Sequence, residues 1–223
     1  MRYMAKYIQW APFAETDPEP AGKLPSYGDA VNLGALNQVV ETPSFNEAKG
    51  YGDDAQKVYV NRFKEAVLAV QITEIPREQM AAVSGAQMEP GQYKNMRFRS
   101  EDTPPKGGLG FIYRNILDDG GGEKCVGVFY PKVKAMLQDT TYDTNGENIS
   151  LAYDKLQFTS SACNSGDWKI ESPDFDTDEE AKAWVDGMFT GASTEIGKDT
   201  LGTPEHTSLA STKAKRASQD TVL

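Results

Sequence analysis

Residues 107–137 read GGLGFIYRNILDDGGGEKCVGVFYPKVKAML and predict one long β-hairpin around which the fold is organised. Two β-rich runs flank Asp118 to Gly122, a turn segment whose residues tolerate positive φ angles. In the return run, the odd positions from Cys125 to Leu137 carry no charge, whereas the even positions change from apolar to lysine-bearing after Tyr130. Because side chains alternate between the faces of a strand, we expect one face buried along its whole length. The other face is apolar only as far as Tyr130, and it could be covered by a helix, another sheet or a neighbouring subunit.

The composition limits the class of protein and its partners. The chain has 223 residues, enough for one large β domain or two small ones, and its net charge is -10. Residues 191–223 hold four basic and four acidic residues, so the acidic excess lies in residues 1–190. An acidic body argues against clamping a nucleic-acid backbone, which requires lysine and arginine. It does not argue against a surface past which nucleic acid slides without binding.

The sequence also predicts the compartment. No apolar run approaches the roughly 20 residues of a membrane span, and the first residues lack the apolar core of a signal peptide. We therefore expect synthesis in the cytosol and no membrane partner. The two cysteines, Cys125 and Cys163, lie in apolar, strand-like runs and are expected to be buried, reduced thiols.

Before the hairpin, the hydrophobic pattern predicts strands and one short helix. Residues 57–75 predict two strands with a bend near Lys64, and in the second strand every other residue from Ala66 to Ile72 is apolar. Pro76 and Gly85 mark the two ends of a short helix. Proline and glycine predict long loops near 15–34 and 48–56. Other extended segments are expected at 3–13, 35–47 and 92–99.

After the hairpin, a turn at 143–146 and short strands at 148–153, 155–163 and 167–170 are expected. Thr177 and Glu180 form a capping-box pattern that begins a helix running to about Phe189. Its apolar face, with Ala181, Trp184, Val185 and Met188, should lie against the outside of a sheet. Residues 1–190 are thus expected to form a mainly β domain, a β-sandwich or half-barrel. Residues 191–223 are expected to form a flexible polar tail.

The residues do not predict a catalytic, cofactor or metal site. His206 is the only histidine, which excludes Ser-His-Asp and Cys-His catalytic groups and histidine-based metal sites. Three alternating aspartates beginning at Asp174 match the opening of a calcium loop. However, Glu179 stands where that loop needs glycine and Val185 where it needs glutamate, so a helix cap is favoured. We expect no enzyme, although a hydrolase that uses two carboxylates remains an alternative.

Seven stretches, in order, carry a resemblance to a known family. They are residues 32–37 (NLGALN), 41–53 (ETPSFNEAKGYGD), 107–111 (GGLGF), 128–135 (VFYPKVKA), 144–147 (TNGE), 161–166 (SACNSG), and 175–177 (FDT) leading into 181–185 (AKAWV). The set spans roughly residues 7–186 and resembles the major tail proteins, or tail tube subunits, of long-tailed non-contractile bacteriophages, in particular the phi13-type family. The segment after Gly191 is outside the pattern.

The resemblance implies a structural virion protein with a β-sandwich or half-barrel fold, one flanking C-terminal helix and a second short helix. Six subunits would form a ring, and rings would stack into a tube around a tape-measure protein, joined by tail terminator and distal tail proteins. Genomic DNA would pass down the lumen without specific binding. The protein would be assembled in the host cytoplasm and reside in the virion tail.

For the subunit interface we expect aromatic and apolar side chains from the loops and strands: Trp10, Phe13, Phe45, Tyr51, Val126, Val128 and Tyr130. Long loops that one small domain cannot bury could pack on a neighbouring copy. The alternative function is a carbohydrate-binding β-sandwich module of a phage or cell surface. Such a module would need aromatic side chains aligned on one exposed face.

Overall fold

The computed structural model describes all residues except 53–54, 92, 118–121, 141–152 and 192–223. The chain divides into two units, Met1–Ser193 and Thr194–Leu223. The first unit is mainly β, as predicted, with helices α1 (Arg77–Ser84) and α2 (Asp178–Thr190) in its described part. The predicted flexible tail after Gly191, the predicted turn at 143–146 and, except for Tyr153, the predicted strand at 148–153 lie outside the described residues.

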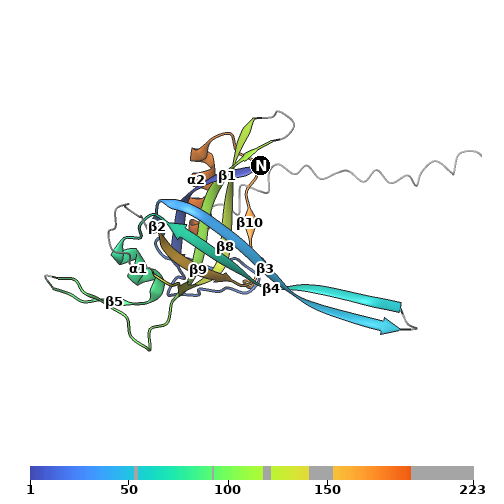
Figure 1. The fold of residues 1–223 in the computed structure, drawn as a ribbon, viewed down its shortest axis with the longest axis horizontal. Coiled ribbons are helices and arrows are strands. Elements are labelled where there is room, and N and C mark those ends of the chain that lie inside the picture. The colour runs from blue at the N-terminus through green and yellow to red at the C-terminus, as the bar shows by residue number, and fades with distance from the viewer. Residues whose placement is uncertain (53–54, 92, 118–121, 141–152, 192–223) are drawn as a thin grey trace, which may run out of the picture. The chain divides into compact units, whose positions relative to one another are not determined.

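The described residues form ten strands, eight of them in one antiparallel sheet with the order β2-β1-β7-β8-β9-β4-β3 and β10 beside β8 (Figure 1). The sheet strands are β1 (Arg2–Pro12), β2 (Val31–Gly34), β3 (Leu36–Gly52), β4 (Ala55–Ile72), β7 (Lys106–Ile116), β8 (Glu123–Leu137), β9 (Asp154–Ser160) and β10 (Ile170–Glu171). A separate short hairpin contains β5 (Gln87–Met88) and β6 (Met96–Arg97). The predicted hairpin at 107–137 is confirmed as β7–β8, whereas the predicted strand at 92–99 is reduced to β6.

The sheet is curled, because its two edge strands, β2 and β3, lie at opposite ends of the strand order and yet are connected by the single residue Ala35. The chain turns at Gly34, whose φ of 125° favours glycine and whose added Cβ would lie 2.4 Å from the Glu74 carbonyl oxygen. β2 pairs with β1, and after the turn β3 pairs with β4 at the opposite end of the strand order. The inner face holds the larger core cluster, which includes the predicted alternation Leu68, Val70 and Ile72.

Helix α2 covers the outer face of β1, β7 and β8, as predicted. Its predicted capping box is confirmed: the Thr177 side chain accepts from the Glu180 backbone N–H, and the Glu180 side chain accepts from the Thr177 backbone N–H. Gly127 allows close approach, because a Cβ there would lie 2.6 Å from the Trp184 ring. Helix α1 likewise has the predicted ends, with Pro76 at the N-cap and a left-handed Gly85 at the C-cap.

A β-bulge in β8 corrects the prediction of one continuous buried face. Leu109 pairs with Tyr130 and Gly107 with Val133, so β8 advances three residues where β7 advances two. The extra residue exchanges the faces of β8. Phe129 therefore packs under α2, whereas Val133, although also an odd position, packs in the inner core. The prediction that the even positions become solvent-exposed after Tyr130 is confirmed at Lys134, which is exposed.

The predicted loop near 48–56 is wrong, because β3 and β4 continue through it with only residues 53 and 54 outside them. The predicted bend near Lys64 is a β-bulge within the single strand β4: Ser44 pairs with Glu65 and Phe45 with Phe63. Strand propensity of the Val58–Val60 run outweighed the local glycines. The loop near 15–34 is irregular as predicted, except that β2 occupies its last four residues.

Candidate assembly surfaces

A two-stranded arm, residues 44–52 of β3 with 55–65 of β4, extends beyond the rest of the sheet (Figure 1). The pairing of β4 with β9 ends at Ala66, so in the described structure each strand of the arm pairs only with the other. The bulge at Lys64 lies at the point where the arm leaves the sheet. An isolated two-stranded ribbon is marginally stable in water, so this arm lacks the support that the remaining strands receive.

The arm exposes large apolar side chains. Phe45 is 46% exposed, Tyr59 is 51% exposed and Val60 is 38% exposed. Phe45, Glu47 and Lys49 on β3 face Phe63, Asn61 and Tyr59 on β4. Both outer backbone edges of the arm are unpaired among the described strands. Exposed apolar strands with free edges are typical of surfaces that pair with another chain.

The base of the arm is fixed to the body by aromatic packing. Phe63 stacks on Trp168, with ring centroids 4.3 Å apart and an interplanar angle of 14°. Trp168 is half-buried and packs against the inner core. Phe45 meets Phe63 edge-on at 6.0 Å. The base of the arm is thus attached to the body through Phe63 and Trp168.

An edge groove of about 540 Å³ separates the start of β1 from β3. Its rims are residues 2–5 and 37–41, and its floor includes Phe111, Val128 and Tyr130. β1 pairs with β2 only from Ile8 to Trp10. Beyond this pairing, β1 and β3 form the two rims of the groove and are not paired with each other in the described structure. Two bulges in β1, with left-handed Met4 and Tyr7, bend the strand along β7 and away from β3.

The charges at the edge groove neutralise one another. Glu41 accepts hydrogen bonds from the Tyr130 hydroxyl at 2.8 Å and from Lys169 Nζ at 2.7 Å, and Lys169 also pairs with Glu171 at 2.9 Å. Burial, followed by the nearby Glu41 carboxylate, raises the pKa of Tyr130. Burial alone would lower the pKa of Lys169, but its hydrogen bonds to Glu41 and Glu171 outweigh it and raise that pKa.

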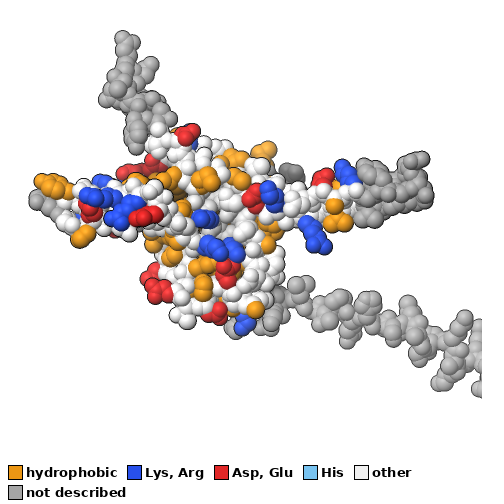
Figure 2. Space-filling model, turned by 90° about the horizontal axis from the view of Figure 1, so that it is seen from below, with side chains coloured by type: hydrophobic (Ala, Val, Ile, Leu, Met, Phe, Trp, Pro, Cys, Tyr) orange, Lys and Arg blue, Asp and Glu red, His pale blue; other side chains and the backbone are white. Residues whose placement is uncertain are grey.

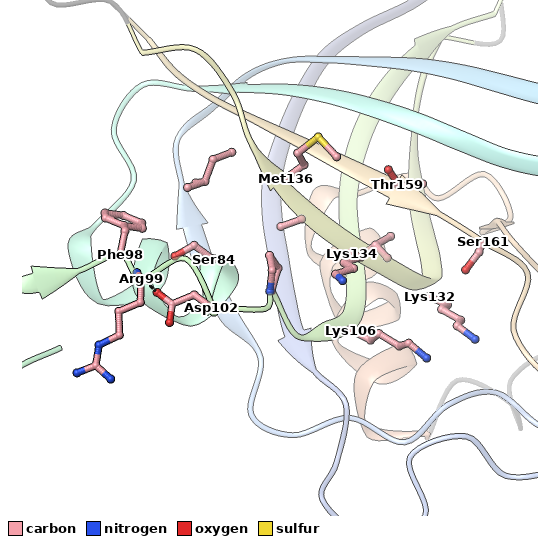
Figure 3. Close-up of a pocket in the computed structure, with 14 residues that line it drawn as sticks. Ser84, Phe98, Arg99, Asp102, Lys106, Lys132, Lys134, Met136, Thr159 and Ser161 are labelled. Carbon is pink, nitrogen blue, oxygen red and sulfur yellow. Dashed lines mark hydrogen bonds between the residues drawn. The ribbon is translucent and has the colours of Figure 1, made fainter. Parts of the chain in front are cut away.

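A second groove, of about 750 Å³, lies between β8 and residues 98–104 and is called the lysine groove below (Figure 3). Four basic residues and one acidic residue line it: Arg99, Lys106, Lys132, Lys134 and Asp102. Exposed Phe98, Met136 and Leu137 add apolar surface. Figure 2, seen from below, shows Lys and Arg side chains interspersed with hydrophobic ones on this side of the molecule.

Glu19 holds two of the lysines. It pairs with Lys106 at 3.2 Å and with Lys132, and the Lys132 hydrogen bond is the main cause of its lowered pKa. These bonds also tie the 13–30 loop to the sheet, together with the Tyr27 hydroxyl, which donates to the Pro131 carbonyl at 2.7 Å. Lys134 has no ion pair within the described part of the chain. The lysine groove therefore keeps an unneutralised cation.

The structure separates the seven predicted interface residues into three groups. Trp10, Val126, Val128 and Tyr130 are at most 4% exposed and belong to the inner core, which corrects the prediction for these four. Strand alternation could not distinguish a face covered by the curled sheet from one covered by a neighbour. Phe13 is half-buried beside Tyr27. Phe45 is exposed on the arm, and Tyr51 lies in β3 opposite Gln56.

Sequence reasoning missed Tyr59, Val60 and Met136 as exposed apolar residues. A signal for the first two was available after the two aspartates at 53–54, because residues 58–60 (VYV) are β-forming and contain no proline. Nothing in the pattern distinguished Met136 from a residue covered by the next strand.

The described residues offer no cluster of candidate metal ligands. They contain no group of three or more His, Cys, Asp or Glu that could hold a metal ion. Cys125 and Cys163 are buried and free, as expected. His206 lies outside the described residues. No helix in the described part of the chain is long and apolar enough to cross a membrane.

The proposed calcium-loop residue Asp178 has a structural role at the start of α2. It accepts hydrogen bonds from Arg114 Nη2 at 3.0 Å and Nε at 3.2 Å, from Lys6, and from the Cys125 thiol at 3.0 Å. Arg114, above all, holds the pKa of this carboxyl well below its usual range. Asp178 therefore fastens the helix to β1, β7 and β8 from its first turn, where a carboxylate also interacts favourably with the helix dipole.

The exposed aromatic residues belong to separate parts of the chain. They come from the arm, from residues 93 and 98, and from the start of β9: Phe45, Tyr59, Tyr93, Phe98 and Tyr153. A sugar-binding platform needs rings aligned on a common surface, so this distribution does not favour the carbohydrate-binding alternative.

Comparison with known proteins leaves the assembly surfaces as the main guide to function. A scan against protein-family models finds no match for this chain, and a search of curated proteins finds no relative. Support for the tail tube expectation therefore comes from the seven resembling stretches and from the surfaces described above.

Proposed function

We propose that this protein is a structural subunit of a bacteriophage tail tube, which assembles into hexameric rings that stack around a central lumen. The observation that carries the proposal is the arm. Phe63, at the base of the arm, stacks on Trp168, whereas Phe45, Tyr59 and Val60 remain exposed. Burying such residues against another copy would stabilise both the arm and the assembly.

The arrangement of surfaces favours heterologous contacts. The arm is formed by β3 and β4, whereas the edge groove and the lysine groove are formed by other parts of the sheet and by residues 98–104. When the donating and receiving surfaces differ, each copy can bind one neighbour and be bound by another. Contacts of this kind generate rings and stacks rather than closed dimers.

The charge of the chain is compatible with a conduit for DNA. At a net charge of -10, the protein repels the phosphate backbone overall and offers few sites for counterion-releasing contacts. The proposed partners are further copies of this chain, a tape-measure protein and the terminator and distal proteins of the tail. The proposed location is the virion tail, after assembly in the host cytoplasm. The proposal includes no enzymatic activity.

Negative-stain electron microscopy of the purified full chain over a range of concentrations tests the proposal. We expect hexameric rings or hollow tubes above a critical concentration. Immunolabelling of particles should place the protein along the tail. A monomer at every concentration, combined with absence of label from tails, would overturn the proposed function.

A further inference from the structure

We propose that the arms of neighbouring copies pair edge to edge, with β3 of one copy beside β4 of the next. This inference rests on the proposed function, because it assumes that copies of the chain associate. It adds which strands meet, in which direction and in which register. The segments involved are residues 45–49 of β3 and 59–63 of β4, all of which the structure describes.

The first reason is that the arm has two free edges of matching length. Within one copy, residues 45–49 pair in unbroken register with residues 59–63, between two bulges. The pairing of β4 with β9 ends at Ala66, and β3 is the last strand in the sheet order. On their outer sides, both segments therefore lack a partner strand among the described residues. Neither segment contains proline, so both edges keep the backbone N–H groups that pairing requires.

The other free edges of the sheet are less suited to such a contact. The outer edge of β1 is interrupted by two bulges, with left-handed Met4 and Tyr7. The part of β3 before Pro43 faces β1 across the edge groove. Strands β2, β5, β6 and β10 have only two to four residues each. Among the described strands, the arm is thus the element that combines two open and regular edges.

Direction and register follow from placing two copies side by side with their arms pointing the same way. β3 and β4 are antiparallel within one arm, so β3 of one copy and β4 of the next are antiparallel as well. With the copies level, each β3 residue lies beside the neighbour's equivalent of the residue that it already faces in its own arm. Examples are Phe45 beside Phe63 and Lys49 beside Tyr59.

The arm already accommodates these pairs within one copy. The rings of Phe45 and Phe63 meet edge-on at 6.0 Å, and Lys49 Nζ lies 5.8 Å from the centre of the Tyr59 ring. Repeating such pairs between copies would cover side chains that are about half exposed in the monomer. The side-chain pairs that stabilise one arm can therefore also hold two arms together.

Pairing of β3 with β4 is also the arrangement that uses both edges of every copy. Two copies related by a two-fold axis would instead pair β3 with β3, or β4 with β4, and would leave the other edge of each arm open. When β3 pairs with β4, one edge of each kind remains for the next copy. This contact therefore continues from copy to copy, as a ring requires.

Disulfide cross-linking between two single-cysteine variants tests the pairing. Ala48 and Val60 are exposed and face each other across the arm, so Ala48→Cys in one chain should lie beside Val60→Cys in its neighbour. Oxidation of an assembled mixture of the two variants should give at least about tenfold more mixed disulfide than the same mixture with Lys155→Cys in place of Val60→Cys. Lys155 is an exposed residue of β9 and serves as the matched control. The natural cysteines are buried.

Hydrogen exchange measures the same contact in the wild-type chain. On assembly, the outward-pointing amides of residues 45–49 and 59–63 should exchange at least about tenfold more slowly than in the monomer. If the wild type assembles but the arm amides gain no protection, the inference is wrong and the proposed function stands. The same conclusion follows if the mixed disulfide stays at the control level or if Ala48→Cys chains cross-link mainly to each other. If the wild type never assembles, the proposed function itself fails.

Discussion

Two β-hairpins of this chain have opposite surroundings. The β7–β8 hairpin is covered on its inner face by the curled sheet and on its outer face by α2. Among the arm residues whose burial is described, 45–49 of β3 and 59–62 of β4 are exposed. The comparison shows that strand formation and burial are separate properties. The first hairpin is stabilised within one subunit, whereas the arm has apolar surface left to be covered by another molecule.

The largest effect on the stability of the subunit is expected where the β7–β8 hairpin is covered on both faces. Val128→Asp places a carboxylate at a position that is 2% exposed, and should lower the free energy of unfolding by about 4 kcal/mol or more. Val60→Asp introduces the same change in the arm, at a position that is 38% exposed, and should cost less than about 1 kcal/mol. Urea denaturation measures both. Equal losses would contradict the contrast between the two regions.

A smaller effect is expected at the attachment of α2 to the hairpin. Asp178→Asn removes the carboxylate that pairs with Arg114 and Lys6, and should lower the free energy of unfolding by about 2 kcal/mol at pH 7. The folded-state pKa of Asp178 is lowered from its ordinary value. Its contribution is therefore complete above the unfolded-state pKa, near 3.9, and decreases as the pH falls below that value.

The pH dependence separates loss of charge from loss of packing at Asp178. The difference between wild type and Asp178→Asn should be largest near neutral pH and shrink towards pH 2. Asp176→Asn is the control, since that side chain is 79% exposed and pairs only with Lys124. A difference between wild type and Asp178→Asn that stays constant from pH 7 to pH 2 would show that the carboxylate charge is not what holds the helix.

The smallest effect on the isolated subunit is expected in the arm. Tyr59→Ser should change the free energy of unfolding by less than about 0.5 kcal/mol, because the side chain is half exposed in the monomer. The same variant should impair assembly, measured by light scattering, about tenfold or more if the arm is buried between copies. Tyr93→Ser, at 79% exposure outside the arm, is the control. Normal assembly by Tyr59→Ser would remove the arm from the interface.

Much of the fold could be predicted because its signals are local. The capping box at Thr177, the ends of α1 at Pro76 and Gly85, and the alternation from Ala66 to Ile72 all depend on residues close in the sequence. The assignment of Val128 to an interface failed because it depends on what covers a face. That is decided by the curl of the sheet, which brings β2 and β3 together from opposite ends of the strand order.

The arm shows the converse error. Glycines at 50 and 52 and aspartates at 53 and 54 predicted a loop, yet the strands continue to Gly52 and resume at Ala55. Turn-forming residues mark where a chain reverses, and they do not limit how far the flanking strands reach. The bulges near Pro131 and Lys64 were also not visible as such, because inserting one residue changes the face of every residue that follows without changing their alternation.

The bulge in β8 makes the number of residues a constraint on this strand, separate from their type. Before it, odd positions such as Phe129 face α2, and after it odd positions such as Val133 face the inner core. A conservative substitution at either position leaves this arrangement intact. A regular strand of the same sequence without the bulge would instead exchange the two faces for residues 133–137 and turn Lys134 inward and Val133 outward, whereas deleting Lys132 would remove the extra residue and leave those faces unchanged. The face on which each residue of β8 lies therefore depends on the bulge as well as on the alternation of residue types.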